Sequence, residues 1–308
     1  MYPPISPYKK SFLHVDTLSS GEKVKVYVEC SGNPKGYPVV YLHGGPGDHI
    51  SPQIRQLYSP KKYNLIMFDQ RGCGKSKPYY HTEKNTTQLL ISDMEKIREW
   101  VGCEKWLVTG GSWGSSLALL YAQAHPTHTS GLILRGVFDL TIDDCVSNAL
   151  FTDKKDEMDK LLNIKTKKDS ERYRKTSRIL SMPKSNKTRK RLVDMLSVDK
   201  GNAIFSRPHK DSEHSKETVA IVGHHYEKNN FFVPKNTIYK NMHKIKHIPC
   251  SIVNGRFDVV TPFHMAYKLK DMFTTCDFNI VNGGHTAREP EIAKALVEAS
   301  DDFIKKLV

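Results

Sequence analysis

Residues 105–125 read KWLVTGGSWGSSLALLYAQAH, and this stretch decides the fold. KWLVT has the composition of a short buried strand, and SSLALLYAQAH is helical in pattern until Pro126 ends it. The segment GGSWG at 110–114 lies between them and fits G-x-S-x-G in the strand–turn–helix context that this pattern requires. The turn is so sharp that it needs glycine, and it exposes the serine hydroxyl at a helix N-terminus, where the helix dipole favours negative charge. Ser112 is therefore the expected nucleophile.

Strand-like and helix-like stretches alternate on both sides of this motif. The strand-like ones are rich in β-branched and aromatic residues, and the helix-like ones carry apolar residues at helical spacing. Strands are predicted at 38–43, 63–70, 131–137, 248–254 and 277–281, and helices at 86–101, 262–272 and near 290–307. This alternation is typical of an α/β protein with a mostly parallel, doubly wound sheet and helices on both faces.

Residues 141–246 lack the alternation. They are rich in lysine and contain amphipathic helical pieces without a clear strand pattern. We therefore predict that residues 1–140 and 247–308 form the core. Residues 141–246 are predicted to be an inserted, mainly helical cap over the carboxyl edge of the sheet. A chain of 308 residues is long enough for one large α/β domain with such an insertion.

The net charge of +14 lies almost entirely in the predicted cap. Residues 151–246 hold 24 Lys and Arg against 12 Asp and Glu, whereas the rest of the chain is nearly balanced. A basic segment can bind nucleic acid, but neither aromatic interleaving nor a known binding motif accompanies this one. Solvated helix faces are the favoured interpretation, and we expect no nucleic-acid partner.

Several features indicate the setting in which the protein works. The first ten residues contain no apolar run, and no stretch approaches the ~20 apolar residues of a membrane span. The six cysteines are scattered without paired spacing, which argues against a disulfide framework and against a zinc site. The sequence also shows no cofactor fingerprint. We expect a cytoplasmic protein that needs neither a metal nor an organic cofactor.

A catalytic serine needs a histidine to take its proton and a carboxylate to hold that histidine in the correct tautomer. Asp258 lies in NGRFD, directly after the strand-like stretch IPCSIVN, and His285 lies in GGH, directly after DFNIV. Both residues follow C-terminal strands, and the chain order is the Ser, Asp, His order known for this serine motif. Five of the other thirteen histidines, among them His209, His214, His224 and His225, lie in the predicted cap. We predict a triad of Ser112, Asp258 and His285.

The segment HGGPG at 43–47 follows an earlier strand-like stretch. In proteins with this serine turn, the loop after that strand lends one backbone N–H to an oxyanion, and the residue after the nucleophile lends another. Glycine lets the backbone approach a substrate carbonyl closely. The predicted oxyanion donors are Gly44 or Gly45 together with Trp113.

These motifs together resemble the proline iminopeptidase family of the α/β-hydrolase superfamily. The resemblance rests on HGGPG, DQRGCGKS at 69–76, GGSWGSSLAL at 110–119, LRGVF at 134–138, NGRFD at 254–258 and GGHTAREP at 283–290. It implies an α/β-hydrolase fold with a cap. It also implies a serine peptidase that releases N-terminal proline from small peptides without a metal or cofactor.

The cap departs from the family pattern. The family binds the substrate amino group through two cap glutamates, one in a Trp-Glu motif and one in an Arg-Ile-Glu-x-His-Tyr pattern. Here AIVGHHY at 220–226 has Gly223 in the place of the second glutamate, and all three tryptophans lie in the predicted core. An esterase or broad amidase with a rebuilt cap, acting on a small ester or amide, is therefore a second hypothesis. A catalytically inactive binding protein is a third, and the complete set of catalytic motifs argues against it.

Overall fold

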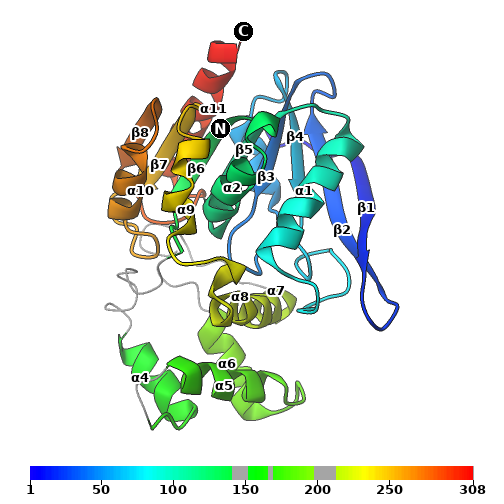
Figure 1. The fold of residues 1–308 in the computed structure, drawn as a ribbon, viewed down its shortest axis with the longest axis vertical. Coiled ribbons are helices and arrows are strands. Elements are labelled where there is room, and N and C mark those ends of the chain that lie inside the picture. The colour runs from blue at the N-terminus through cyan, green and yellow to red at the C-terminus, as the bar shows by residue number, and fades with distance from the viewer. Residues whose placement is uncertain (141–151, 166–168, 198–212, 308) are drawn as a thin grey trace.

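The computed structural model describes residues 1–140, 152–165, 169–197 and 213–307. Its centre is an eight-stranded sheet with the strand order β1-β2-β4-β3-β5-β6-β7-β8 (Figure 1). The strands are β1 (Pro7–Thr17), β2 (Lys23–Gly32), β3 (Tyr37–Leu42), β4 (Tyr63–Phe68), β5 (Trp106–Ser112), β6 (Thr129–Val137), β7 (Cys250–Gly255) and β8 (Cys276–Val281). The pairs β1–β2 and β2–β4 are antiparallel, and the pairs from β4 to β8 are parallel. The predicted mostly parallel sheet is confirmed.

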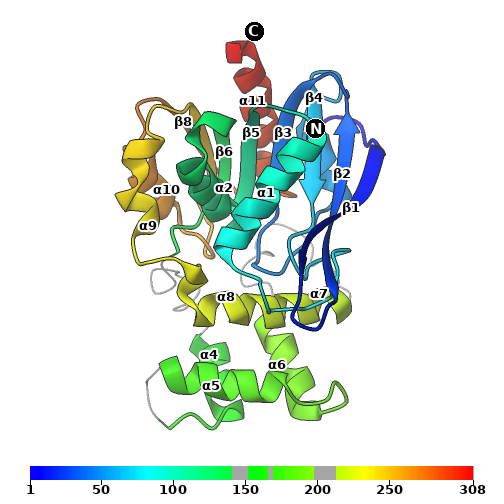
Figure 2. The same cartoon turned by 45° about the vertical axis from the view of Figure 1, so that its right-hand side comes forward.

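Helices cover both faces of this sheet (Figure 2). One face carries α1 (Thr87–Val101), α2 (Trp113–Ala124) and α10 (Phe263–Lys270), and the other carries α11 (Pro290–Leu307) with the short helix η1 (Pro52–Leu57). Apolar side chains are buried between the sheet and each helix layer. This arrangement is a doubly wound α/β core, as the sequence predicts. Among the described helices, none is both long enough and apolar enough to cross a membrane.

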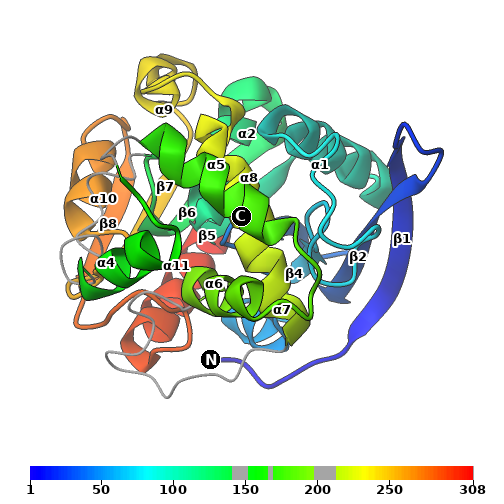
Figure 3. The same ribbon diagram turned by 90° about the horizontal axis from the view of Figure 1, so that it is seen from below.

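The helices that follow β6 and precede β7 in the chain form the cap. They lie as a layer across one end of the core (Figure 3). Its described helices are α4 (Thr152–Leu161), α5 (Asp169–Leu180), α6 (Lys187–Ser197), α7 (Glu213–Thr218), the π-helical turn η4 (Val219–Gly223) and α8 (His224–Lys228). The junction of α7 and η4 packs on the loop after β3. A β-carbon added at Gly47 would lie 2.7 Å from the carbonyl oxygen of Thr218 and 2.8 Å from Cα of Val219. The described cap is mainly helical, as predicted. The predicted cap also includes 141–151, 166–168 and 198–212, which lie outside the described residues.

The last part of the predicted cap packs on the core. The short helix α9 (Thr237–Lys240) lies beside α2, where Gln123 Nε2 donates to the carbonyl oxygen of Ile238 at 2.7 Å. The hydroxyl of Tyr239 donates to the carboxylate of Asp139 at 2.7 Å, just after β6. The domain boundaries after residues 140 and 246 stay predictions.

A buried ion pair joins the loop after β4 to α1. Arg71 donates to both carboxylate oxygens of Asp93, from Nε at 2.6 Å and from Nη2 at 2.8 Å. Its third nitrogen, Nη1, donates to the Asp16 carboxylate at 3.1 Å and to the carbonyl oxygen of Lys84 at 2.6 Å. The side chains of Arg71 and Asp93 are almost completely shielded from solvent. One guanidinium therefore ties together three separate segments of the core.

We expect the substitution Asp93→Ala to lower the free energy of unfolding by about 3–5 kcal/mol, because it leaves the Arg71 charge buried without its main partner. Urea denaturation followed by circular dichroism measures this loss. Asp302→Ala is the matched control, since Asp302 pairs with Lys305 at the surface. Its unfolding midpoint should stay close to that of the unmodified protein. Equal midpoints for both variants would contradict the stabilising role of the Arg71–Asp93 pair.

Candidate active site

Ser112 lies at a strained turn between β5 and α2. Its φ of 56° and ψ of −128° are disfavoured for a residue with a β-carbon. Close packing on both sides enforces this conformation. A β-carbon added at Gly110 would lie 2.2 Å from the carbonyl oxygen of Gly114, and one added at Gly114 would lie 2.1 Å from that of Leu42. Only glycine fits at these two positions, which is what the G-x-S-x-G pattern predicts.

The loop with the predicted oxyanion donors lies beside Ser112. A β-carbon added at Gly44 would lie 3.3 Å from Ser112 Cβ and 3.8 Å from its Oγ. The next residue, Gly45, has a φ of 108°, in the left-handed region. Trp113 is the first residue of α2, so its backbone N–H is one of those that a helix leaves unpaired at its N-terminus. Backbone groups from both segments therefore border the space around the serine hydroxyl.

Gln70 connects the loop that carries the predicted oxyanion donors (residues 43–47, the oxyanion loop) to the serine turn. Its Nε2 donates to the carbonyl oxygen of His43 at 2.9 Å, and its Oε1 accepts from the indole Nε1 of Trp113 at 2.9 Å. Its backbone N–H donates to Nε2 of His43 at 3.0 Å, while Nδ1 of that ring lies 3.0 Å from the carbonyl oxygen of Gly44. Burial lowers the pKa of His43, so the neutral ring accepts at Nε2 and donates at Nδ1. These contacts fix the loop relative to Trp113.

Asp258 and His285 meet at the ends of β7 and β8. The Nδ1 atom of His285 lies 2.8 Å from Oδ2 of Asp258. The backbone N–H groups of Val260 and Thr261 donate to Oδ1 at 2.9 and 2.8 Å, and the Thr261 hydroxyl donates to Oδ2 at 2.9 Å. Burial alone would raise the pKa of Asp258, but His285 and the hydrogen bonds from Thr261 outweigh it and hold that pKa below its usual value. Asp258 is thus an ionised acceptor for the histidine.

Arg135 of β6 lies between the serine turn and the imidazole of His285. Its Nη1 donates to the carbonyl oxygen of His285 at 2.6 Å and lies 3.3 Å from Nε2 of the ring. A β-carbon added at Gly111 would lie only 2.3 Å from Nη2 of this guanidinium. In the described part of the chain, no hydrogen bond joins Ser112 to His285. The predicted triad residues therefore lie together at one edge of the sheet, and Arg135 lies beside Nε2 of His285.

The sequence assigned no role to four residues that hold this site together. These residues are Gln70, Arg135, Thr261 and Glu289. The carboxylate of Glu289 accepts the backbone N–H of Gly284 at 2.5 Å and so shapes the loop that carries the histidine. Three of the four lie inside DQRGCGKS, LRGVF and GGHTAREP, the motifs that carry the family resemblance, so those motifs contained the signal. Thr261 lies outside all of them.

Possible metal ligands lie elsewhere. Across residues 1–140, 152–165, 169–197 and 213–307, the group of His, Cys, Asp and Glu side chains close enough to share a metal ion is Glu95, His125 and His128. His125 follows the C-terminal end of α2, whereas Ser112 precedes its N-terminal end. At the helical rise per residue, α2 separates the two places by roughly 18 Å.

Comparisons with known proteins agree with this fold. The family model for the alpha/beta hydrolase fold matches residues 37–289. The proline iminopeptidase of Neisseria gonorrhoeae is 34% identical, with 100% of each chain covered. That of Arabidopsis thaliana is 36% identical over 98% of this chain and 81% of its own. A solved esterase from Exiguobacterium antarcticum has a TM-score of 0.59 at 21% identity, covering 96% of this chain and 99% of that one, which shows a shared fold. The predicted α/β-hydrolase fold is confirmed.

We expect Gln70→Leu to lower kcat for hydrolysis by up to about 100-fold, because displacement of a catalytic group by 1 Å can cost that much. The leucine cannot bond to His43 or to Trp113, so the oxyanion loop loses its fixed position. Steady-state kinetics measure the change. Gln123→Leu is the matched control. Gln123 is also buried and also donates to a carbonyl oxygen, but it lies at the end of α2 that is remote from Ser112. If both variants keep the original kcat, Gln70 does not position the loop.

Proposed function

The chain belongs to the proline iminopeptidase family of α/β-hydrolases, and from this premise we propose that it releases N-terminal proline from small peptides by serine catalysis. In this proposal Ser112 is the nucleophile, His285 the general base and acid, and Asp258 the residue that orients the histidine. The observation that carries the proposal is the 2.8 Å contact between His285 Nδ1 and Asp258 Oδ2 at the sheet edge where the strained serine turn lies.

The proposed reaction has two stages. Ser112 Oγ attacks the substrate carbonyl carbon while Nε2 of His285 takes the hydroxyl proton. The carbonyl electron pair moves to oxygen, and this oxyanion accepts hydrogen bonds from the backbone N–H groups of Trp113 and of Gly44 or Gly45. The carbon–nitrogen bond then breaks, the leaving amine takes the proton from His285, and the acyl group stays on Ser112. Water deprotonated by His285 attacks the acyl carbon. The bond between that carbon and Ser112 Oγ then breaks, Oγ takes the proton from His285, and the acyl group leaves as the free acid.

Asp258 and Arg135 act on the histidine from opposite sides. The ionised carboxylate of Asp258 keeps the proton on Nδ1 and stabilises the imidazolium that forms during the reaction. Arg135 Nη1 lies 3.3 Å from Nε2, the nitrogen that must receive the serine proton. The mechanism therefore requires the guanidinium to move away from Nε2 when the substrate binds. Catalytic contacts that are loose without substrate and tighten in its complex are common in enzymes.

The cap decides which substrate the triad meets. The η4 turn packs on the oxyanion loop, and a β-carbon added at Gly223 would lie 3.3 Å from the carbonyl oxygen of Pro46. A glutamate at this position would bring a carboxylate beside that loop. Another cap acid, Glu217, is held by Arg189, whose Nη1 and Nη2 donate to its two oxygens at 2.6 and 2.5 Å. Both side chains are buried, and Arg189 compensates the charge of Glu217. Glu217 is therefore not expected to bind a substrate amino group.

Gly223 favours a second candidate function, which is that of an esterase or broad amidase. A protonated N-terminal proline needs a carboxylate to compensate for the loss of water around its charge. Aryl esters carry no such charge, and their leaving group needs less protonation by His285. We therefore expect slow hydrolysis of proline arylamide relative to short-chain aryl esters, measured in parallel on the same protein. Faster hydrolysis of the proline arylamide than of the aryl esters would favour the peptidase function for the cap as it stands.

We expect Ser112→Ala to remove hydrolysis of every substrate, by about a millionfold in kcat, while the thermal melt stays that of a folded protein. His285→Ala should cost a similar factor, because the members of a triad act as a unit. The double variant should be no slower than either single one. Turnover retained by a well-folded Ser112→Ala protein would exclude the serine mechanism. Near-normal turnover of His285→Ala would assign the base to another group.

A test of the cap compares Gly223→Glu with Gly223→Gln. The two side chains have nearly the same size, and both β-carbons meet the same tight contact with Pro46, so only the charge differs. A hydrogen bond to a charged group contributes roughly 1.5–3 kcal/mol. Gly223→Glu should thus exceed Gly223→Gln in kcat/KM for proline arylamide by roughly 10- to 150-fold. The two variants should hydrolyse a neutral aryl ester at the same rate. If Gly223→Glu and Gly223→Gln hydrolyse the proline arylamide equally fast, residue 223 does not face the substrate amino group.

A further inference from the structure

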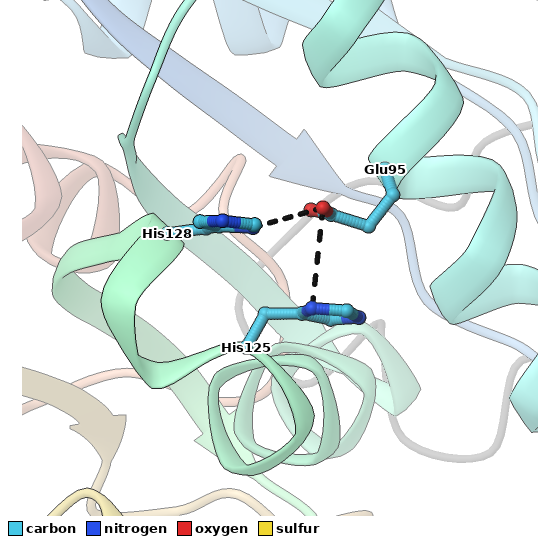
Figure 4. Close-up of side chains that lie close together, drawn as sticks. All are labelled: Glu95, His125 and His128. Atoms are coloured by element: carbon cyan, nitrogen blue, oxygen red, sulfur yellow. Dashed lines mark ion pairs between the residues drawn. The ribbon is translucent and has the colours of Figure 1, made fainter.

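Three side chains with metal-binding groups lie close together at the far end of α2 (Figure 4). Glu95 comes from α1, His125 caps the C-terminal end of α2, and His128 ends the short helix η2 (Pro126–His128). The Nδ1 atoms of His125 and His128 lie 3.9 and 2.8 Å from Oε2 of Glu95. The two rings are stacked almost parallel, with centroids 5.5 Å apart. None of the three belongs to the proposed hydrolytic site.

His128 carries a buried nitrogen without a hydrogen bond. Its Nδ1 is shielded from solvent and, although Oε2 of Glu95 is only 2.8 Å away, the contact lacks the direction of a hydrogen bond. Buried polar atoms normally have a partner. A cation bound between the nitrogen and the carboxylate would satisfy both groups.

The neighbours of Glu95 fix its carboxylate and leave one coordination position open. Oε1 accepts from Arg98 Nε at 3.0 Å and from the Tyr121 hydroxyl at 2.6 Å. Among the described donors, Oε2 accepts from Arg98 Nη2 at 2.9 Å. Because a carboxylate oxygen offers about two lone pairs, Oε2 keeps one for the side where the histidines lie. Metal-binding carboxylates are usually held by hydrogen bonds of this kind.

The orientation of His125 is also fixed. Its backbone N–H donates to the carbonyl oxygen of Tyr121 at 2.8 Å, and its ring packs against the ring of Tyr121 with centroids 5.3 Å apart. Tyr121 in turn accepts the indole N–H of Trp106 at 3.0 Å. A buried network of the core therefore orients two of the three candidate ligands before any ion binds.

We propose that Glu95, His125 and His128 form a binding site for a divalent zinc ion. Two imidazoles and one carboxylate are a donor set that Zn²⁺ accepts in tetrahedral geometry, with water as the fourth ligand. Ligand atoms about 2.0–2.2 Å from the ion lie roughly 3.3 Å apart in a tetrahedron, between the two distances observed here. Because the two rings are stacked almost parallel, the His125 ring has to turn out of the stack to direct its lone pair at the same ion.

The bound ion would link α1 to the turn between α2 and β6. The site is a helix length away from Ser112, so the ion takes no part in hydrolysis and acts on the stability of the core. This proposal departs from the sequence-based expectation of no metal site. That expectation rested on cysteine spacing, and the His-x-x-His segment gains its carboxylate only through the packing of α1 against α2.

The first experiment is a calorimetric titration of metal-free protein with zinc chloride. We expect saturation near one ion per chain. Changes beside a metal ligand already weaken binding about 10- to 100-fold, so His128→Asn should weaken it by at least about tenfold. His247→Asn is the matched control, since His247 is exposed and lies outside the cluster. It should bind zinc like the unmodified protein, and so should Ser112→Ala, which separates this proposal from the hydrolytic one.

A second measurement guards against effects of misfolding in the variant. Zinc should raise the Tm of the unmodified protein and of His247→Asn, but not that of His128→Asn. Loading the unmodified protein with Co²⁺ should give the strong visible absorption of a tetrahedral site. Zinc affinity unchanged in a folded His128→Asn protein would overturn the proposal. No saturable zinc binding by the unmodified protein would overturn it too.

Discussion

The close approach of α2 to the end of β3 is the constraint on which the rest of the molecule depends. A β-carbon at Gly114 would lie 2.1 Å from the carbonyl oxygen of Leu42, so the first turn of the helix lies directly on the strand backbone. This contact forces Ser112 into its positive φ, a strain on the order of 1–3 kcal/mol. Burial of nearly all of α2 offsets that strain. The same contact brings the serine beside the loop at Gly44, so packing of the core and geometry of the site have one origin.

The segment after β4 transmits this constraint in two directions. Gln70 turns toward the site and bonds both His43 and Trp113, whereas Arg71 turns toward α1 and pairs with Asp93. Neighbouring residues thus anchor the oxyanion loop on one side and the helix layer on the other. A change that unpairs the arginine would also disturb the segment that carries the glutamine. Stability and catalysis are therefore coupled in this segment. The activities of Asp93→Ala and Gln70→Leu should be compared under conditions where both variants are fully folded.

Periodicity and motif context predicted the central strands, the flanking helices and the clustering of Asp258 with His285. They did not single out β1 or β2. β1 is an edge strand with exposed lysines and few buried side chains, so its pattern resembles that of a loop. β2 alternates and is mostly buried, so its sequence did carry a strand signal. The contacts of Thr261 and Arg135 depend on how β6, β7 and β8 pair, which local sequence does not encode. The roles of the triad, the cytoplasmic location and the lack of a nucleic-acid partner stay predictions.

Three carboxylates show that the partner of an acid decides what the acid can do. Asp258 accepts from the histidine and from Thr261 and stays ionised, so it can orient an imidazole. Glu217 is buried together with Arg189, which donates to both of its oxygens, and the pair joins α6 to α7 within the cap. Glu95 is also held by an arginine, but one lone pair of Oε2 stays open toward two imidazoles, which is the condition for binding a cation. The β-carbon of a glutamate at position 223 would lie 3.3 Å from the carbonyl oxygen of Pro46, beside the oxyanion loop. The charge of that glutamate would be available to a substrate, and this is the property that the present cap lacks.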